Sequence, residues 1–383
     1  MTKLAGHILT PQGFIAGEIE FGADAANLGR IARISGIPVS EAVARDSGQP
    51  LILPGFIDLH VHGGGGRDIM EGGDAARCVA EMHARHGTTA LLATTMTAPA
   101  ADLLTAFSGL APLCGTPGRQ AATGARILGV HLEGPYINAE KLGAQPDFAR
   151  PMQLAELAEL NALAPIRLIT LAPEIPANMA AIEALCAAGY RVQIGHTQGS
   201  YEDGVTALDR GAGGFTHLFN AMSGLHHRQP GMVGAALAQA RYAEIIPDLV
   251  HVHPGAIRVA LRAIPCLYCV TDSTAAAGMP DGEYRLGRHT VSKCLGGVRL
   301  VDGTLAGSTL TMIQALHNLV GALGLDLTDA SRRLSTHAAD YLGVTDRGRL
   351  APGAWGDLVL LDRDLKLTDV FTEGVSLDHP HAG

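Results

Sequence analysis

The chain has 383 residues, of which 47% are hydrophobic and 17% charged, and its formal net charge is −9 at pH 7. This composition is typical of a folded globular protein with room for one large and one smaller domain. The acidic balance, without any run rich in Lys and Arg, argues against nucleic acid or an anionic membrane surface as a partner.

Both ends of the chain have the pattern of short β-strands. HILTPQGFIAGEIEF (7–21) alternates apolar and polar residues around a Pro-Gln-Gly turn, which predicts a hairpin. GRLAPGAWGDLVLLD (348–362) consists of short apolar runs broken by Gly, Pro and Asp. We therefore expect a small β-domain built from residues 1–50 and 345–383, and a larger domain over residues 51–344.

The chain has no visible targeting signal. Its start, MTKLAGHILTPQG, lacks the apolar core and cleavage site of a secretory signal, and no stretch is apolar for long enough to span a bilayer. The six cysteines are scattered through apolar contexts, which is typical of a reducing compartment. We expect a cytoplasmic protein that is not bound to a membrane.

The middle of the chain alternates apolar runs with amphipathic or Ala-rich stretches such as LAELAELNAL (154–163). This alternation predicts parallel βαβ units, and eight such runs predict an α/β fold of the (β/α)₈ barrel type. The eight runs are residues 51–60, 88–95, 126–133, 166–174, 190–196, 213–218, 244–251 and 265–272.

Five of these runs end in residues that can bind a metal ion. His60 and His62 are separated by one residue, so on a strand their imidazoles share one face. The carboxyl ends of barrel strands all open onto one rim, where active sites lie. Imidazole and carboxylate ligands suit zinc, iron(II) or manganese, and six of them suffice for two ions bridged by a carboxylate. The other candidate ligands are Glu133, His196, His217 and Asp272.

A metal centre of this kind predicts hydrolysis by an activated water. Asp272 follows the apolar run CLYCV, where burial would raise its pKa and a metal ion would lower it. A carboxylate in that balance can accept a proton from the water and return it to a leaving group.

The loop HLFNAMSGLHHRQPG (217–231) directly follows one ligand run and is a candidate for substrate contacts. It offers Asn220 and Arg228, and arginine and backbone N–H groups commonly hold phosphate. Arg228 could equally be a solvated loop charge. His251 ends the run 244–251 on the same rim, where it is either a substrate ligand or a structural hydrogen-bonding group.

Six segments together resemble the N-acetylglucosamine-6-phosphate deacetylases of the amidohydrolase superfamily, in order and spacing, from about residue 50 to the C-terminus. The most specific are the HLEGP and THLFNAM motifs. The resemblance implies a (β/α)₈ barrel with a small β-sandwich from both termini, a homodimer, and release of acetate from a sugar-phosphate substrate. The segments are PGFIDLHVHGGGG (54–66), GVHLEGPYIN (129–138), QIGHT (193–197), FTHLFNAM (215–222), VTDSTAAAG (270–278) and LAGSTLTM (305–312).

The same resemblance assigns roles to individual residues. One or two divalent ions, zinc or iron, would be bound, and Asp272 would be the catalytic acid and base as well as a metal ligand. Arg228 would reach into the site of the neighbouring subunit. A first ion would be bound by Glu133, His196 and His217, and a second by His60 and His62. The phosphate would be contacted by Asn220, Ala221 and His251.

Two positions depart from the family pattern. Gln145 stands where the family often has a histidine that polarises the substrate carbonyl, and a neutral amide can donate a hydrogen bond there but carries no positive charge. The carbonyl would then depend more on the metal. Leu249 stands where the family usually has glycine after Asp248.

Three alternatives stay open at this level. The same hydrolysis could act on N-acetylgalactosamine 6-phosphate or another N-acyl amino sugar. Cyclic-amide hydrolases of the superfamily carry a bridging lysine on the fourth strand, whereas IRLITLAPE (166–174) has none. A non-catalytic barrel that only binds a ligand is the third, although this chain keeps all six candidate metal ligands.

Overall fold

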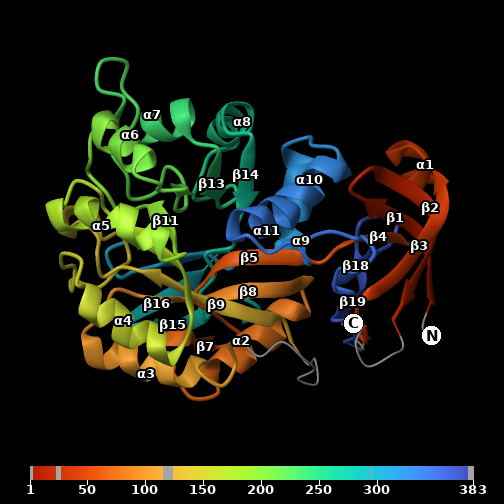
Figure 1. Ribbon diagram of the computed structural model, residues 1–383, viewed down its shortest axis with the longest axis horizontal. Helices are drawn as coiled ribbons and strands as arrows, with labels where there is room; N and C mark the ends of the chain where they lie inside the picture. The colour runs from red at the N-terminus through yellow and green to blue at the C-terminus, as the bar shows by residue number, and fades with distance from the viewer. Residues whose placement is uncertain (1–2, 23–26, 115–123, 295, 378–383) are drawn as a thin grey trace.

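Strands from both ends of the chain form one sheet in the computed structural model, which describes residues 3–22, 27–114, 124–294 and 296–377. In Figure 1 this sheet lies on the right, where strands from the N-terminal and C-terminal ends of the chain meet. The predicted hairpin is present, with Thr10 paired to Gly13 across the turn. The strand order is β20 (Val375–Ser376), β19 (Leu367–Thr372), β18 (Leu358–Leu361), β4 (Leu51–Pro54), β1 (Lys3–Thr10), β2 (Gly13–Phe21) and β3 (Ile31–Pro38).

Successive residues of this sheet face two different cores, as strand geometry requires. Ile52 packs in a small cluster with Ile8 and Leu358, whereas its neighbours Leu51 and Leu53 belong to the main core of the chain. One face of the terminal sheet therefore contributes side chains to the main hydrophobic core of the chain. The domain boundaries at residues 50/51 and 344/345 stay a prediction.

The larger body contains parallel strands arranged as the predicted (β/α)₈ barrel. Among the described residues, six strands form one curled sheet and two more form a pair beside it. A parallel bridge between Val61 and Ser273 links the ends of the two groups. The strands are β12 (Gly214–Phe215), β11 (Arg191–Ile194), β10 (Ile166–Leu171), β9 (Arg126–Glu133), β8 (Thr88–Thr95) and β5 (Phe56–Val61), followed by β13 (Tyr242–Ile245) and β14 (Cys266–Cys269).

The run 51–60, predicted as a single barrel strand, is divided into two strands at Gly55. Its first half, β4, pairs with β1 and β18 of the terminal sheet, and its second half, β5, pairs with β8 of the barrel. A Cβ atom at Gly55 would lie 2.3 Å from the Thr89 side chain, so glycine is required where the chain crosses between the two sheets.

Helices connect consecutive barrel strands and cover the outside of the barrel (Figure 1). Ser200 and Asp203 form a capping box at the start of α6, which satisfies backbone N–H groups that the helix leaves unpaired. Among the described residues, no helix has the length and apolar character needed to cross a bilayer. The connecting helices are α2 (Ala75–Ala84), α3 (Ala100–Leu110), α4 (Leu154–Leu163), α5 (Pro176–Ala187), α6 (Tyr201–Asp209), α7 (Gly231–Gln239) and α8 (Pro254–Ala263). The others are α1 (Glu41–Asp46), α9 (Met312–His317), α10 (Leu327–Leu334), α11 (Thr336–Leu342) and the short helices η1 (Ile69–Glu71), η2 (Ala139–Lys141) and η3 (Asn318–Ala322).

A small antiparallel sheet follows β14 and was not predicted from the sequence. It consists of β15 (Gly282–Leu286), β16 (His289–Cys294) and β17 (Gly297–Arg299). Its first turn is held to the barrel because Gly287 N donates to Asp68 Oδ2 at 2.8 Å. Asp68 itself belongs to the short hairpin of β6 (Gly63–Gly64) and β7 (Arg67–Asp68) that continues the HVHGGGG motif. The sheet thereby covers one side of the barrel rim.

A buried ion-pair network joins the terminal sheet to β9. Arg347 pairs with Asp357 and, at 2.5 Å, with Glu373, which also accepts from Arg126 at 2.7 Å. We expect Arg347→Ala to lower the free energy of unfolding by about 3–5 kcal/mol, because the buried carboxylate of Asp357 loses its guanidinium partner and Glu373 keeps only Arg126. Urea unfolding followed by circular dichroism measures this. Arg288→Ala, which breaks the exposed pair with Asp102, is the control and should change stability little; an equal loss in both variants would contradict the prediction.

Candidate metal centre and substrate cavity

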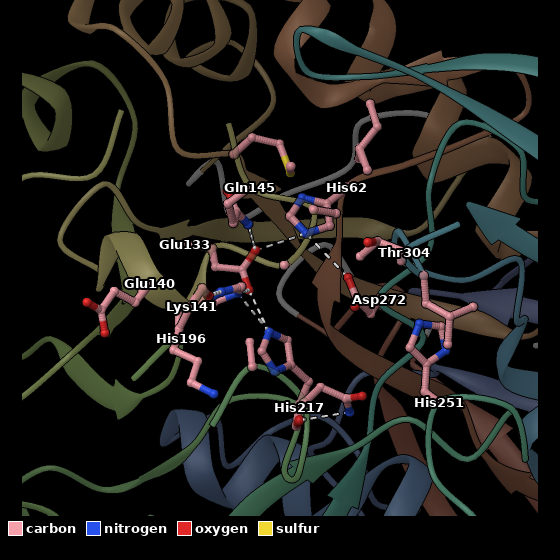
Figure 2. Close-up of a pocket in the computed structure, with 18 residues that line it drawn as sticks. His62, Glu133, Glu140, Lys141, Gln145, His196, His217, His251, Asp272 and Thr304 are labelled. Carbon is pink, nitrogen blue, oxygen red and sulfur yellow. Dashed lines mark hydrogen bonds and ion pairs between the residues drawn. The ribbon is translucent and has the colours of Figure 1, made fainter. Parts of the chain in front are cut away.

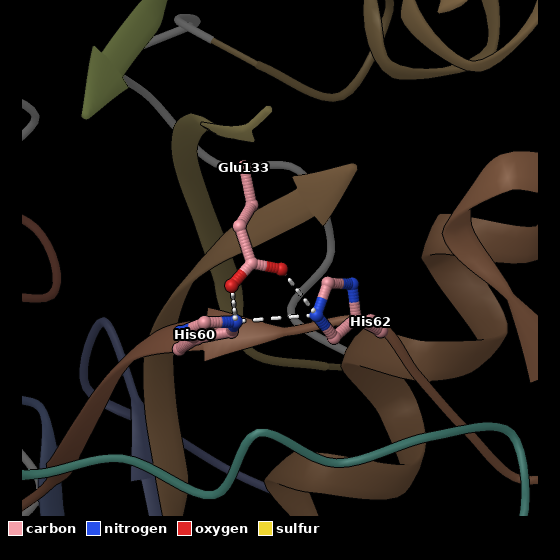
Figure 3. Close-up of side chains that lie close together, drawn as sticks. All are labelled: His60, His62 and Glu133. Carbon is pink, nitrogen blue, oxygen red and sulfur yellow. Dashed lines mark hydrogen bonds and ion pairs between the residues drawn. The ribbon is translucent and has the colours of Figure 1, made fainter. Parts of the chain in front are cut away.

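The six candidate metal ligands converge at the carboxyl ends of five barrel strands; Figure 2 shows five of them, and Figure 3 shows the sixth, His60. His60 lies within β5 and His62 just after it, and Glu133 is the last residue of β9. His196 and His217 each follow a strand by two residues, and Asp272 follows β14 by three. All six side chains are buried, with Asp272 the most accessible at 8%.

Glu133 lies between the two pairs of histidines. Its Oε1 atom is 3.2 Å from His196 Nε2 and 3.0 Å from His217 Nε2, and its Oε2 atom is 3.1 Å from His62 Nε2. Figure 3 shows His60 and His62 side by side on one strand, facing this carboxylate. Asp272 Oδ1 lies 3.4 Å from His60 Nε2 and 3.3 Å from His62 Nε2. Glu133 thus belongs to two groups of side chains that could each hold a metal ion, one with each histidine pair.

The ring nitrogens are oriented as metal ligands require. His60 Nδ1 lies 3.0 Å from a Glu244 oxygen and His196 Nδ1 lies 2.7 Å from the Lys141 carbonyl, and both partners only accept hydrogen bonds. Each of these Nδ1 atoms therefore carries a hydrogen, and each Nε2 faces the centre, where it donates to Glu133 when protonated and offers a lone pair to a metal ion once deprotonated. Within each pair the two Nε2 atoms are 3.1 Å apart. Lone pairs held this close in a buried site fit a divalent cation, and the all-nitrogen-and-oxygen donor set suits zinc, iron(II) or manganese.

The local electrostatics favour positive charge at this point. Burial opposes protonation of His62, but hydrogen bonds to Asp272 and Glu133 raise its pKa to about 9. Burial likewise opposes ionisation of Glu133, yet His60 and the hydrogen bonds from His196 and His217 hold its pKa well below the usual value. Among the described residues, the buried carboxylates of Glu133 and Asp272 form ion pairs only with histidines and not with lysine or arginine. They therefore attract protons or a divalent cation.

Three of the ligand candidates have left-handed backbone conformations. The φ angles are 48° at His196, 30° at His217 and 51° at Asp272. Such conformations cost on the order of 1 kcal/mol or more at residues other than glycine, and they concentrate at functional sites. Here the strain turns each side chain inward at the point where its strand ends.

The centre lies in a cavity of about 350 Å³. Its lining includes four of the substrate contacts suggested by sequence. Asp272 also lines it, with the other candidate ligands except His60 (Figure 2). Arg228 does not line this cavity and is exposed on the loop before α7. The four contacts are Gln145, Asn220, Ala221 and His251.

His251 lies in a loop rather than at a strand end, because β13 already ends at Ile245. Its Nδ1 is 2.6 Å from Asp248 Oδ2, which directs the opposite side of the ring towards the cavity. Leu249, at the position where the family usually has glycine, has a φ of 66°. Leucine therefore adopts here a left-handed conformation that favours glycine.

Gln145 is held in one orientation beside the metal centre. Thr97 N donates to its Oε1 at 2.6 Å, so its amide nitrogen faces the site and donates to Glu133 Oε2 at 2.5 Å. Gln145 also lines the cavity, and we expect its second N–H to donate to a substrate carbonyl there. We expect Gln145→Ala to lower kcat by about 10²-fold at saturating zinc, with little change in KM, because one preorganised donor is lost. Loss of its hydrogen bond to Glu133 should also weaken metal binding, so zinc is kept in excess in the assay. Gln145→His, which restores a hydrogen-bond donor, is the matched variant in the steady-state assays. A Gln145→Ala enzyme with normal kcat would contradict the role of Gln145 as a donor to the substrate.

Several residues of the site were missed in the sequence. Glu244 holds His60, and the Lys141 carbonyl holds His196 while its side chain lines the cavity. Leu286 and Thr304 reach the cavity from the unpredicted sheet and the turn after it. Only Glu244 left a signal, as a carboxylate at the head of the apolar run 244–251. The other contacts depend on segments that meet only in the folded chain.

A parallel barrel whose rim gathers buried histidines and carboxylates defines a class of metal-dependent hydrolases. The model of the amidohydrolase family matches residues 51–377. The chain belongs to this metal-dependent family.

Its relatives within the family are sugar-phosphate deacetylases. A protein of Escherichia coli O157:H7 named N-acetylgalactosamine-6-phosphate deacetylase is 39% identical over 353 residues, covering 90% of this chain and 92% of the relative. The N-acetylglucosamine-6-phosphate deacetylase of Lysinibacillus sphaericus is 36% identical over 354 residues, or 90% of each chain. A solved mutant of the Mycobacterium smegmatis N-acetyl-D-glucosamine-6-phosphate deacetylase, in complex with N-acetyl-D-glucosamine-6-phosphate, has a TM-score of 0.87 at 34% identity and covers 98% of this chain and 99% of its own.

Proposed function

We propose that the protein is a metal-dependent deacetylase that converts N-acetylglucosamine 6-phosphate to glucosamine 6-phosphate and acetate. The observation that carries this proposal is the convergence of Asp272 with four imidazoles and Glu133, all but His60 lining one cavity. The N-acetylglucosamine-6-phosphate deacetylases among the relatives support the choice of substrate.

In this proposal Glu133, His196 and His217 hold a first ion, and His60 and His62 a second, with zinc or iron as the metal. A divalent ion bound there supplies Lewis acidity that lowers the pKa of a bound water towards neutrality. Asp272 then accepts the proton of the attacking water and delivers it to the amide nitrogen, so that the amine leaves neutral. Two backbone hydrogen bonds hold Asp272 in place, from its N to His60 O at 2.9 Å and from Ser308 N to its O at 2.7 Å.

The cavity lining also supplies the contacts proposed for the phosphate. Asn220 and Ala221 line it directly after the ligand His217. Burial opposes protonation of His251, but its hydrogen bond to Asp248 raises its pKa, so positive charge is favoured where a phosphate would lie. Lys141 adds a second cation to the lining. Arg228 would reach the cavity of a neighbouring copy in a homodimer; the homodimer and the cytoplasmic location both remain predictions.

The proposal is tested by measuring acetate release from a panel of N-acetylated hexosamines with and without a 6-phosphate. We expect kcat/KM for N-acetylglucosamine 6-phosphate to exceed that for the unphosphorylated sugar by at least about 10²-fold, because charge-assisted hydrogen bonds to phosphate are lost without it. Equal rates would remove the phosphate roles of His251 and Lys141. No acetate from any sugar would favour the non-catalytic binding barrel.

The second candidate substrate is N-acetylgalactosamine 6-phosphate. The 39% identical Escherichia coli relative bears the name of that activity, which makes it a specific alternative. The two sugars differ only at the C4 hydroxyl, which a single loop residue can distinguish. Including both 6-phosphates in the panel decides between them, since the physiological sugar should have the higher kcat/KM.

A further inference from the structure

A layer of buried polar side chains lies in the barrel interior directly below the metal centre. We call this layer the polar belt. Its members come from successive strands or the residues just after them, and each is hydrogen-bonded to the next. The Tyr268 hydroxyl donates to Glu244 Oε1 at 3.3 Å and accepts from Gln193 Nε2 at 2.5 Å. The belt consists of Glu244, Tyr268, Gln193, Thr216, Thr170 and His131, all of them fully buried.

Glu244 is the one carboxylate of the polar belt, and it touches both halves of the metal centre. Its Oε2 accepts from His60 Nδ1 at 3.0 Å and from the backbone N of His217 at 3.1 Å. His60 belongs to the second-ion pair and His217 to the first-ion set. Among the described residues, its only ion-pair partner is the His60 imidazole.

A buried carboxylate without lysine or arginine is costly unless its hydrogen bonds compensate. The hydrogen bonds that compensate Glu244 include one from the ring of a candidate metal ligand, which a purely structural carboxylate would not need. By accepting from Nδ1, Glu244 keeps a hydrogen on that nitrogen, so that Nε2, which faces Glu133 at 3.4 Å, is the nitrogen left to bind an ion. A carboxylate behind a ligating imidazole also raises the basicity of the ligand and fixes its ring.

We propose that Glu244 is a positioning residue that prepares His60 for the second ion and joins the two ion sites through His217. The inference rests on the two-ion centre of the proposed function. It predicts that the second ion is bound weakly when the carboxylate of Glu244 is absent. The first ion depends on the side chains of Glu133, His196 and His217, and Glu244 contacts only the backbone N of His217, so the first ion should be retained.

The test compares metal binding by the wild-type chain and by Glu244→Gln. Each protein is stripped with chelator and titrated with zinc, and bound zinc is counted by mass spectrometry of the elements after dialysis. We expect two ions per chain in the wild type, whereas Glu244→Gln should need about 10- to 100-fold more zinc to fill the second site. Excess zinc should restore most of the activity of the variant, which a misfolded chain could not achieve.

Asp58→Asn is the matched control. Asp58 is equally buried in the same barrel interior, but it accepts hydrogen bonds only from Thr271 and from the backbone of His60, and touches no ligand ring. This variant should keep the wild-type zinc titration. Glu244→Asp is the second test variant: it keeps the buried charge but withdraws it from His60, and it should also weaken the second site.

The outcomes separate the two proposals. Normal second-site affinity in both Glu244 variants, or an equal loss in Asp58→Asn, would overturn the role of Glu244. A wild-type chain that binds a single ion under replete conditions would do the same. A wild-type chain that binds two ions but deacetylates no sugar phosphate would remove the proposed function and leave this inference standing.

Discussion

Replacing Asp272 by Asn is expected to lower kcat for acetate release by about 10²- to 10⁴-fold, the range that general acid–base catalysis contributes. Asparagine keeps the shape of the side chain and an oxygen that faces His60 and His62, but it cannot accept the proton of the attacking water. Burial opposes ionisation of Asp272, while the neighbouring His60 and His62 lower its pKa, so the carboxylate form needed as a base is favoured. Steady-state assays of acetate release measure the loss.

The metal content of the same preparation distinguishes loss of the base from loss of the site. We expect nearly normal zinc or iron per chain in Asp272→Asn, because Glu133 and the four histidines remain. Asp281→Asn, an exposed change a few residues further along the chain, should behave as the wild type. Turnover near the wild-type rate in Asp272→Asn would exclude the proposed mechanism.

Replacing Glu133 by Gln is expected to remove both activity and bound metal. Glu133 oxygens lie within 3.4 Å of Nε2 atoms from all four histidines, so this one side chain serves both ion sites. Outer-sphere changes already weaken metal sites by about 10- to 100-fold, and loss of a bridging ligand should exceed that. Metal analysis after dialysis, with activity measured at increasing zinc, checks the expectation.

The contrast with Glu244→Gln makes this result interpretable. Added zinc should rescue the Glu244 variant but not Glu133→Gln, because only the latter loses an atom that contacts the ion. Two firmly bound ions in Glu133→Gln would show that the histidine pairs suffice, and the bridging role would have to be abandoned.

Much of the architecture was determined by local sequence patterns. Alternation of apolar runs with helical stretches predicted the parallel barrel, because a strand buried on both faces must be apolar throughout. Residues that can bind a metal ion stand at the ends of five such runs, and this predicted that they converge, because parallel strands share one carboxyl-terminal rim. These residues are His60, Glu133, His196, His217 and Asp272. Order along the chain was enough for both conclusions.

Other features were decided only by tertiary structure. The division of residues 51–60 at Gly55 depends on the approach of Thr89, and the position of His251 depends on where β13 stops pairing. The orientation of Gln145 is set by Thr97, and the tautomer of His60 by Glu244. The sequence by itself determined which chemical groups reach the rim. The directions in which those groups point were decided by hydrogen bonds between segments far apart in the chain, and local patterns carry no information about such contacts.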